Sequence, residues 1–467
     1  MHWTGEEIAR ATGAAVAPTL PPCDGICIDT RGEVAGRLYV ALRGVRFDGH
    51  AFAADALRAG AAAVLVDHLP AGVAAERAVV VTDTLRALGD LAAHARRVWG
   101  GALIAITGSN GKTTTKEMLA AIAVAAYPGR RVLWTEGNLN NLIGVPLTLL
   151  RLRGAEALAV VEMGMNAFGE IARMTAIATP TVGVITNVGA AHLAGVGSLA
   201  GVARAKGELF DGMPADGVIA VNMDDARVAR CGAAFPGRRV EFGAGRAVRA
   251  EAVDDRGADG LTFVLCIEAD RAVVQLRAVG RHNIHNALAA AAAASAAGIG
   301  LEAIAAGLAA AAPPQMRMQV VRLANGVTLI NDAYNANPDS ACAALDAVGR
   351  LPGRPIAVLG EMCELGAESA ALHAAVGAHA AAAGVRWLVA VEPGAAPLAE
   401  GARRAGLAVD VCGDAAAAAA LLVARWQPGD VILVKGSRGA DDEDGVRRFG
   451  ARMAAVVAHL VERGGAA

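Results

Sequence analysis

The sequence has no excess of either charge and no long apolar run, and each absence removes a class of protein. Lys and Arg total 43 against 45 Asp and Glu, a net charge of −2, so no basic field favours nucleic acid or anionic lipid. No stretch of about 18 strongly apolar residues occurs, and the nearest candidate, NALAAAAAASAAGIG at 286–300, is typical of a packed helix. The opening residues, MHWTGEEIAR, carry acids where a secretory leader would carry basic residues. We therefore expect a cytoplasmic protein with small-molecule partners, no nucleic acid and no integral membrane segment.

The cysteines also lack the spacing of a disulfide or zinc framework. There are seven, an odd number, and no two of them form a CxxC pair. Paired thiols in a secreted scaffold or a zinc site need closer and more regular spacing, so we expect reduced, buried thiols.

What the sequence does contain is an alternation of short apolar runs and helical patterns. At roughly 150 residues per domain the chain has room for about three, and three blocks differ in motif content: 1–98, 99–313 and 314–467. The first predicts a small α/β unit. The other two repeat buried runs such as TVGVITNV and DVILVKGS between helical patterns, which indicates parallel sheets, and AAPPQ interrupts a helix between them. We predict a three-domain α/β protein whose ligands bind at the carboxyl ends of strands.

A glycine-rich turn, GSNGKTTTKEM at 108–118, follows the strand-like run ALIAIT and opens a helical pattern. In this setting Gly108 and Gly111 let backbone N–H groups converge on an anion, Lys112 reaches the outer phosphates, and the Thr113 hydroxyl can ligate Mg²⁺. The longer Walker spacing would need a glycine in place of Ile106, so an ordinary βα turn is the alternative. The expected nucleotide contacts are Gly108, Ser109, Asn110, Gly111, Lys112, Thr113 and Thr114.

Three polar side chains follow other strands of the same predicted sheet. Glu162 ends the run VVE, and His192 and Lys206 lie in VITNVGAAHLAGVGSLAGVARAKGELF. Each has an ordinary explanation by itself: a helix start, a satisfied polar residue or a solvated face. With phosphate and water as further ligands, however, Mg²⁺ accepts a carboxylate and an imidazole. A deprotonated lysine could also react with CO₂ and give a carbamate, which acts as another carboxylate, although nothing in the spacing demands it.

Four stretches together resemble the Mur ligases of peptidoglycan synthesis. They are GSNGKTTTKEM, GNLNNLIGVPLTLL at 137–150, VEMGMNAFGEI at 161–171 and TNVGAAHLAGVGSLAGVARAKGELF at 186–210. The likeness extends over almost the whole chain and accounts for the short loop, because the family uses GxxGK[ST]. It implies a central P-loop parallel-sheet ATPase domain between a small N-terminal α/β UDP-binding domain and a C-terminal Rossmann-like α/β domain. It also implies that ATP activates a carboxylate as an acyl phosphate, which an amine then attacks.

The resemblance assigns roles to these polar residues. Lys112 contacts the ATP phosphates, Thr113 and Glu162 hold one Mg²⁺, and His192 holds a second together with carbamylated Lys206. Catalysis would therefore depend on these residues and on Arg317, in MRMQ, which is similar to the family's arginine at the γ-phosphate. The residue before Arg317 is methionine here, where relatives often have glycine.

Two further stretches resemble the family's nucleotide contacts. GRHNIHNALAAAAA at 280–293 places Asn283 and Asn286 on one helical face near the nucleotide, although a helix N-cap explains the same residues. NDAYNANPDSACAAL at 331–345 offers Asp332 to the ribose, with Asn335 and Asn337 nearby; an Asn-Pro turn with capping side chains is the alternative.

The outer domains would bind the two substrates that are joined. In VLVKGSRG, Lys435, Ser437 and Arg438 could bind the carboxylate of an incoming dipeptide, or could form a solvated loop. The segment GADDEDGVRRF then replaces the family's usual Met-rich run, which leaves its contacts open. In the first domain, IDTRGEVAGRLYVAL and FDGHAF resemble the UDP-sugar site, with a turn and a salt bridge as the alternative. The expected uridine-diphosphate contacts are Thr30, Arg31, Asp48, Gly49 and His50.

One absence bears on the acceptor. The last domain has no D-N-P-R-like motif, which relatives that add diaminopimelate or lysine usually carry. The resemblance therefore favours a monomeric ligase that joins D-alanyl-D-alanine to UDP-N-acetylmuramoyl-tripeptide, with ATP and two Mg²⁺ ions as cofactors. The alternatives are an amino-acid-adding Mur ligase, a folylpolyglutamate synthase and a P-loop ATPase that forms no bond.

Overall fold

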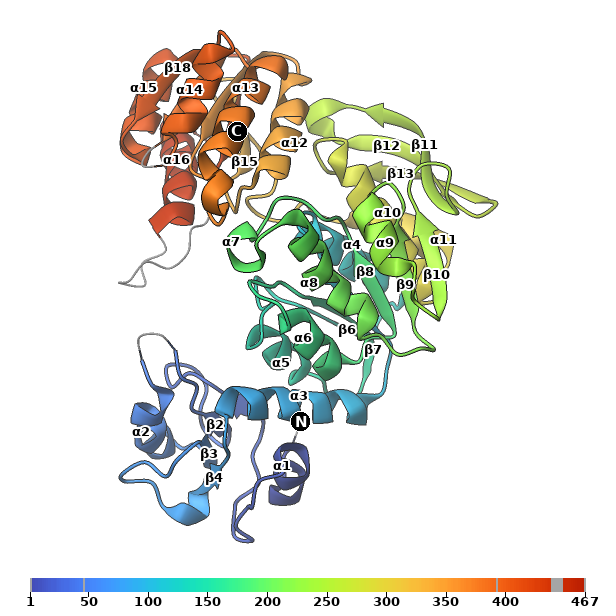
Figure 1. Cartoon of the computed structure of the whole chain (residues 1–467), viewed down its shortest axis with the longest axis vertical. Coiled ribbons are helices and arrows are strands. Elements are labelled where there is room, and N and C mark those ends of the chain that lie inside the picture. The colour runs from blue at the N-terminus through green and yellow to red at the C-terminus, as the bar shows by residue number, and fades with distance from the viewer. Residues whose placement is uncertain (1, 45–46, 392–393, 438–447, 466–467) are drawn as a thin grey trace.

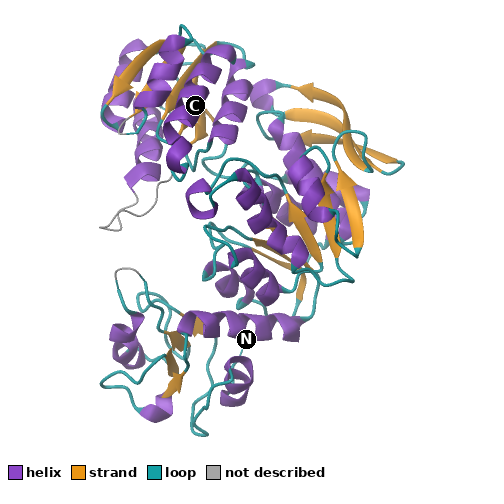
Figure 2. Cartoon of the chain, viewed as in Figure 1, coloured by secondary structure: helices purple, strands orange, loops and turns teal. Residues whose placement is uncertain are grey.

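A computed structural model of the chain describes residues 2–44, 47–391, 394–437 and 448–465 (Figure 1). Within these residues there are three sheets, of four, nine and six strands, each flanked by helices (Figure 2). The predicted three-domain α/β architecture is confirmed. None of the described helices has both the length and the apolar content needed to cross a bilayer. All seven cysteines are described and are free thiols, but only four are buried as expected, whereas Cys231, Cys342 and Cys363 are partly exposed.

The N-terminal unit is built on a small parallel sheet of order β1-β2-β3-β4. Its strands are β1 (Ile26–Cys27), β2 (Leu38–Val40), β3 (Ala63–Val66) and β4 (Ala78–Val80). Its helices are α1 (Gly5–Thr12), α2 (Ala53–Arg58) and α3 (Thr84–Trp99), with 3₁₀ turns η1 (Gly49–Phe52) and η2 (Ala75–Arg77). The helix α3 packs on α1 and also on two helices of the central unit, so it connects the two units (Figure 1).

The central unit contains the nine-stranded sheet, of order β13-β12-β11-β10-β9-β8-β5-β7-β6. In the order of the sheet, the strands β6, β7, β5, β8, β9, β10 and β11 run parallel to one another. The strand β12 pairs antiparallel with both β11 and β13, a departure from the parallel sheet that was predicted. The parallel strands are β5 (Leu103–Thr107), β6 (Arg131–Trp134), β7 (Glu156–Glu162), β8 (Val182–Ile185), β9 (Val218–Asn222) and β10 (Arg238–Phe242). The antiparallel extension is β11 (Val248–Asp255), β12 (Leu261–Ile267) and β13 (Asp270–Leu276), with η3 (Gly257–Asp259) between β11 and β12.

Helices cover both faces of this sheet, which explains why its central strands are apolar throughout. Alternate residues of β5 enter two different cores: Ile104 and Ile106 pack on one side, Leu103 and Ala105 on the other. The helices are α4 (Lys112–Ala126), α5 (Gly144–Leu149), α6 (Glu170–Ala178), α7 (Leu193–Val196), α8 (Leu199–Asp211), α9 (Ala226–Gly232), α10 (His282–Ala296) and α11 (Leu301–Ala310). The alanine-rich run at 286–300 lies largely in α10, which is buried, as predicted for a packed helix.

The C-terminal unit has a six-stranded sheet of order β14-β15-β19-β16-β17-β18, parallel except for the edge strand β14. Its strands are β14 (Gln319–Arg322), β15 (Thr328–Asp332), β16 (Arg354–Leu359), β17 (Trp387–Val391), β18 (Ala408–Cys412) and β19 (Asp430–Lys435). Its helices are α12 (Pro338–Gly349), α13 (Ser369–Ala382), α14 (Ala396–Arg404), α15 (Ala415–Arg425) and α16 (Arg448–Gly464), with η4 (Gly366–Glu368) before α13.

The predicted domain limits fall close to breaks between elements. The limit at 98/99 lies one residue before the end of α3, and the limit at 313/314 lies between the end of α11 and the start of β14. Because α3 contacts the central unit along its length, the assignment of that helix to the first domain stays a prediction.

Candidate functional site

The carboxyl ends of strands from the central and C-terminal sheets face a shared cavity of about 810 Å³. Lining residues come from both units, so the cavity lies at the seam between them. The predicted site residues that line it are Ser109, Asn110, Gly111, Lys112, Thr113, Thr114, Glu162, His192, Asn283, Asn286, Arg317, Asp332, Asn335, Asn337 and Lys435.

The turn between β5 and α4 requires glycine at two positions. Gly111 is the N-cap of α4 with φ of 80°, and a Cβ there would overlap the side-chain amide of Asn286. Gly108 has φ of 147°, and a Cβ there would overlap the Thr186 hydroxyl. Both dihedrals are in the region that favours glycine, and both sites are too crowded for a larger residue. The sequence-predicted strand, turn and helix are therefore present, with the first N–H groups of α4 facing the cavity.

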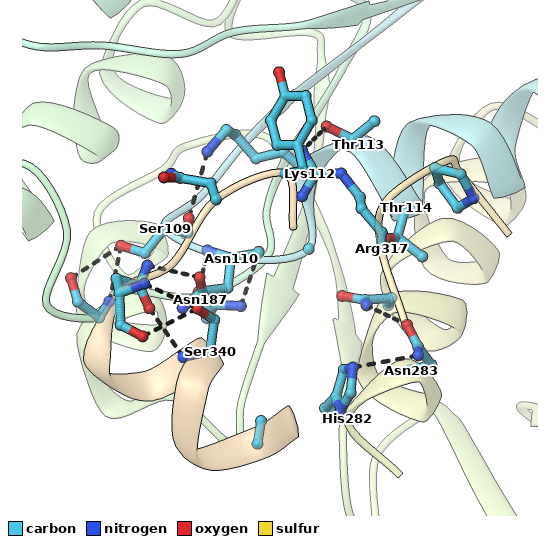
Figure 3. Close-up of a pocket in the computed structure, with 18 of the residues that line it drawn as sticks. Ser109, Asn110, Lys112, Thr113, Thr114, Asn187, His282, Asn283, Arg317 and Ser340 are labelled. Carbon is cyan, nitrogen blue, oxygen red and sulfur yellow. Dashed lines mark hydrogen bonds between the residues drawn. The ribbon is translucent and has the colours of Figure 1, made fainter. Parts of the chain in front are cut away.

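A second loop, which follows β8, holds this turn in place (Figure 3). Asn187 accepts a hydrogen bond from the Asn110 N–H at 2.9 Å and donates one to the Asn110 carbonyl at 3.0 Å. The Thr186 hydroxyl donates to the same carbonyl at 2.6 Å. Sequence reasoning assigned no role to Thr186 or Asn187, although both lie in the quoted TNVG stretch directly after a strand, and that position was the available signal.

Cations from both units converge above the turn. Lys112 Nζ donates to the Gly108 carbonyl at 2.8 Å, and burial lowers the pKa of this lysine while Glu162 opposes the shift. Arg317 Nη2 donates to the Thr113 hydroxyl at 2.9 Å, across the seam. The Arg317 guanidinium also lies over the Tyr334 ring, 4.2 Å from its centroid, which fixes its direction. An anionic group placed in the cavity would therefore meet positive charge from two sides.

The residues on both sides of Arg317 have an uncommon backbone conformation. Met316 has φ of 56° and Met318 has φ of 50°, both in the left-handed region. Glycine adopts that region without steric cost, whereas a methionine there is strained. This strain beside Arg317 is consistent with a segment that is fixed by its surroundings.

Three predicted metal-site residues each carry a buried polar atom that makes no hydrogen bond, although the one on His192 lies beside a carboxylate. Among the described residues, the buried side-chain atoms that lack a hydrogen bond are Trp3 Nε1, Glu162 Oε2, His192 Nδ1 and Lys206 Nζ. His192 Nδ1 lies 2.6 Å from Glu364 Oε2, but this close ionic contact is not aligned as a hydrogen bond. Unpartnered buried polar atoms cost about 1–3 kcal/mol each, so their concentration here is expected where a ligand completes them.

The chemistry of these residues fits a divalent cation. Glu162 ends β7, and its Oε1 accepts from Asn140 Nδ2 at 2.8 Å, which leaves Oε2 for a metal. Lys206 on α8 is 0% exposed, and burial, helped by the nearby charge of Lys112, holds its pKa well below the usual value. A neutral amine is the form that reacts with CO₂. Sequence reasoning missed Asn140, although it lies in the quoted GNLNN stretch.

All the lysines of the chain lie in or beneath this site. They are Lys112, Lys116, Lys206 and Lys435. Lys116 is 1% exposed and donates to the Thr135 carbonyl at 2.8 Å, while the Thr135 hydroxyl accepts from the Glu162 N–H at 2.9 Å. Lys116 thus supports the strand end that presents Glu162, a role that sequence reasoning did not assign.

The two asparagines of α10 lie together, as predicted from their spacing. Asn286 Nδ2 donates to Asn283 Oδ1 at 2.8 Å, and Asn283 Nδ2 donates to the Val279 carbonyl at 2.8 Å. The helix begins at His282 with Arg281 as its N-cap, so the alternative that an asparagine caps it is wrong. The neighbouring His282 is partly buried and lies beside Asn283 (Figure 3), and desolvation lowers its pKa to about 4.

In the C-terminal unit, Lys435 and Ser437 are each 3% exposed, so the alternative of a solvated loop is wrong for them. Lys435 Nζ donates to Asp332 Oδ2 at 2.5 Å and to the Asn335 carbonyl at 2.9 Å. Ser437 donates to the Ala336 carbonyl at 2.7 Å and does not line the large cavity.

Two more predicted residues of this unit have different outcomes. Asn337 caps α12, as the alternative reading of the Asn-Pro turn proposed, and its Nδ2 also donates to Asn110 Oδ1 at 2.8 Å across the seam. Arg438 and the segment GADDEDGV that follows it lie outside the described residues.

The predicted uridine-diphosphate contacts lie in the N-terminal unit and do not line the cavity. Arg31 is exposed and paired with Asp29 at 2.6 Å. The Asp48 carboxylate accepts from the His50 N–H at 2.9 Å, and the Tyr39 hydroxyl donates to the Gly49 carbonyl at 3.0 Å. The alternative of a turn and a salt bridge therefore describes what these residues do in this structure, and their contact with UDP, like that of Thr30, stays a prediction.

Comparison with known proteins identifies the same architecture. Profiles of the Mur ligase family match three parts of the chain: the family's catalytic domain at 22–96, the Mur ligase middle domain at 106–294 and the Mur ligase, glutamate ligase domain at 316–438. Together they cover most of the sequence and coincide with the three units of the structure.

Individual relatives agree with the profiles. The UDP-N-acetylmuramoyl-tripeptide--D-alanyl-D-alanine ligase of Escherichia coli (strain K12) is 41% identical over 371 residues, 79% of this chain and 81% of that protein. A crystal structure of MurF from Acinetobacter baumannii is 33% identical, covers 99% of both chains and has a TM-score of 0.89. The MurF ligase of Thermotoga maritima in complex with ADP is 26% identical, covers 96% of this chain and 99% of its own, and has a TM-score of 0.83. The chain therefore belongs to the Mur ligase family.

Proposed function

We propose that this protein is an ATP-dependent, ADP-forming ligase that joins D-alanyl-D-alanine to UDP-N-acetylmuramoyl-tripeptide through an acyl phosphate. The product is the UDP-muramoyl-pentapeptide precursor of peptidoglycan. The observation that carries the proposal is the seam cavity, where the glycine turn of one unit meets Arg317 of the next beside the unpartnered Glu162 Oε2 and Lys206 Nζ. The names of the E. coli and A. baumannii relatives support the same reaction, and the ADP complex of the T. maritima relative supports use of ATP.

The phosphates of ATP would lie on the turn at 108–113. The N–H groups at the start of α4 would hold the β- and γ-phosphates, while Lys112 and Arg317 would neutralise the charge that moves from ATP to the acceptor carboxylate. Asn283 and Asn286 would contact the nucleotide, and Asp332, at the end of β15, its ribose. Because Arg317 comes from the C-terminal unit, docking of that unit completes the phosphate site.

We also propose two magnesium positions. Thr113 and Glu162 would hold one, and His192 with Lys206 in its carbamylated form would hold the other. When bound, Mg²⁺ would neutralise the negative charge of the phosphates as the substrate carboxylate approaches them. The buried amine of Lys206, whose pKa burial holds well below its usual value, and the free Oε2 of Glu162 support this assignment.

The substrates would enter from opposite ends. Thr30, Arg31, Asp48, Gly49 and His50 would bind the uridine diphosphate, and Asn335, Asn337, Lys435, Ser437 and Arg438 the dipeptide. Lys435 already pairs with Asp332, so its effect on a dipeptide would be exerted through that pair. The domain limits, the monomeric state and the cytoplasmic location stay predictions.

The test is a phosphate-release assay with ATP and UDP-N-acetylmuramoyl-tripeptide, with and without D-alanyl-D-alanine. Release that needs both substrates, together with formation of the pentapeptide, supports the proposal. Release without the dipeptide would instead indicate an ATPase that forms no bond, and release with a free amino acid would indicate an amino-acid-adding ligase. Tripeptides that end in diaminopimelate and in lysine should both be assayed, to define the third residue.

A further inference from the structure

A loop of the C-terminal unit reaches across the seam to His192. The loop lies between β16 and η4, and Glu364 is its contact residue. The Glu364 carbonyl accepts from the Ala194 N–H at 3.1 Å, and Glu364 Oε2 lies 2.6 Å from His192 Nδ1. Backbone and side chain of one residue thus both meet the segment that carries His192.

The backbone is in an uncommon conformation on both sides of this contact. Glu364 has φ of 65° and His192 has φ of 57°, in the left-handed region that non-glycine residues seldom adopt. Such residues cost about 1–3 kcal/mol each, and they persist where the surroundings hold them and cluster at functional sites. His192 and Glu364 are two such residues in direct contact, one from each unit, which is the pattern expected at a functional site.

The loop is fixed from behind by buried partners. His373 on α13 is 1% exposed; its Nε2 accepts from the Met362 N–H at 2.8 Å, and its Nδ1 lies 2.7 Å from the Ser369 carbonyl. The next residue, Cys363, donates its N–H to the Ser437 hydroxyl at 3.0 Å. Glu364 is therefore presented by a rigid support, and the position of the C-terminal unit determines where its carboxylate lies.

The contact determines which edge of the His192 ring is accessible. Nδ1 is closed to solvent, yet the side chain is 23% exposed and lines the cavity, so another part of His192 is accessible there. The other carboxylates that the C-terminal unit places in the cavity have different partners: Asp332 pairs with Lys435, and Asp339 accepts from the Ala190 N–H at 3.0 Å.

We propose that Glu364 is a positioning residue that holds the His192 imidazole from the opposite unit and leaves Nε2 free to ligate a metal ion. Carboxylates that pair with the second nitrogen of a metal-ligating histidine fix its tautomer and its orientation. In this chain the carboxylate comes from another unit, so the metal ligand is fully oriented only when the C-terminal unit is docked. This inference rests on the metal role proposed above for His192.

The test compares Glu364→Ala, Glu364→Gln and the control Glu368→Gln. Glu368 is exposed, lies four residues further along and makes no capping hydrogen bond, so its substitution removes the same charge without the contact. Binding of Mn²⁺ is titrated by electron paramagnetic resonance in the presence of a non-hydrolysable ATP analogue. Glu364→Ala should weaken Mn²⁺ binding about 10–100-fold. Glu364→Gln should retain part of the affinity, because its amide oxygen can occupy the same position beside Nδ1, and Glu368→Gln should match the unchanged protein.

Two further measurements separate positioning from other roles. In a His192→Ala background, Glu364→Ala should cause no additional loss of Mn²⁺ affinity, since it acts through the absent ring. The KM for D-alanyl-D-alanine should not change in Glu364→Gln. Unchanged Mn²⁺ affinity in Glu364→Ala overturns the proposal, and so does a raised KM for the dipeptide alone, which would assign Glu364 to the acceptor ammonium. The Mn²⁺ titration needs neither the UDP-sugar substrate nor the dipeptide, so its outcome is independent of whether the proposed ligation is correct.

Discussion

Several polar residues at the seam carry a buried atom without a hydrogen bond, whereas a charged residue of the N-terminal surface is exposed and already paired. At the seam, Glu162, His192 and Lys206 each have a buried polar atom without a hydrogen bond. In the N-terminal unit, Arg31 is 89% exposed and already paired with Asp29, whose pKa this pairing lowers to about 2.

This difference separates catalysis from recognition. Buried groups without partners are costly in the free protein and interact strongly with a ligand that completes them, because little water competes. Exposed pairs cost little and must exchange one partner for another when a ligand binds, so each contributes little. We therefore expect substitutions at the seam to abolish turnover, and substitutions on the N-terminal surface to alter substrate affinity.

The largest effect should follow Lys112→Ala. The substitution removes a cation from the phosphate turn and no core volume, so ligation should fall at least about 1,000-fold while the melting temperature changes little. Product formation and thermal unfolding by circular dichroism measure the two quantities. Arg130→Ala, an exposed cation beyond the far end of α4, is the matched control and should behave as the unchanged protein. Near-normal ligation by Lys112→Ala would contradict the proposed difference between the seam cavity and the N-terminal surface.

Lys206 should rank next and tests the carbamate. Lys206→Ala and Lys206→Arg should both lose about 100-fold or more in ligation, because neither side chain can form a carbamate ligand. Added acetate or formate should partly restore Lys206→Ala, since a short carboxylate can occupy the vacated volume, and should leave Lys206→Arg inactive. Substantial activity in Lys206→Arg would show that positive charge alone suffices at this buried position.

Arg31→Ala should have a smaller effect of a different kind. An exposed charge contact is worth up to about 1 kcal/mol, so the KM for the UDP-sugar substrate should rise about fivefold with kcat unchanged. Steady-state kinetics at saturating ATP and dipeptide measure both constants. A large fall in kcat would contradict the distinction between the two regions.

The smallest expected signal is a change of shape. Arg317, Asn337 and Asp339 bridge the seam by single hydrogen bonds, and the stretch AAPPQM at 311–316, between α11 and β14, is a suitable hinge. Small-angle scattering should show partial compaction with an ATP analogue and full compaction once the UDP-sugar substrate is added. Asn337→Ala should enlarge the free protein slightly. An equal radius of gyration in all states would indicate a protein that is closed before ligands bind.

Much of this molecule was predictable because its signals are local. The strands β5, β7, β8, β15, β16 and β19 lie where apolar runs of the right length predict them, and the phosphate turn lies where its glycines predict it. The antiparallel extension β11–β13 was not foreseen, because β11 and β13 are polar and half-exposed and lack the continuous apolar run that marks a buried parallel strand; only β12, LTFVLCI, has such a run.

The sequence by itself determined which residues are candidates for chemistry: Lys112, Glu162, His192 and Lys206 follow strands or glycines, and the resemblance to the Mur ligases gave them their predicted roles. Only the tertiary structure decided their partners. It placed Glu364 on His192, Lys435 on Asp332 and Arg317 on Thr113, and it left Lys206 buried and unpaired. The physical reason is that a motif specifies residue types and local backbone, whereas a contact between units depends on how whole sheets and helices dock, which is the sum of many weak interactions spread along the chain.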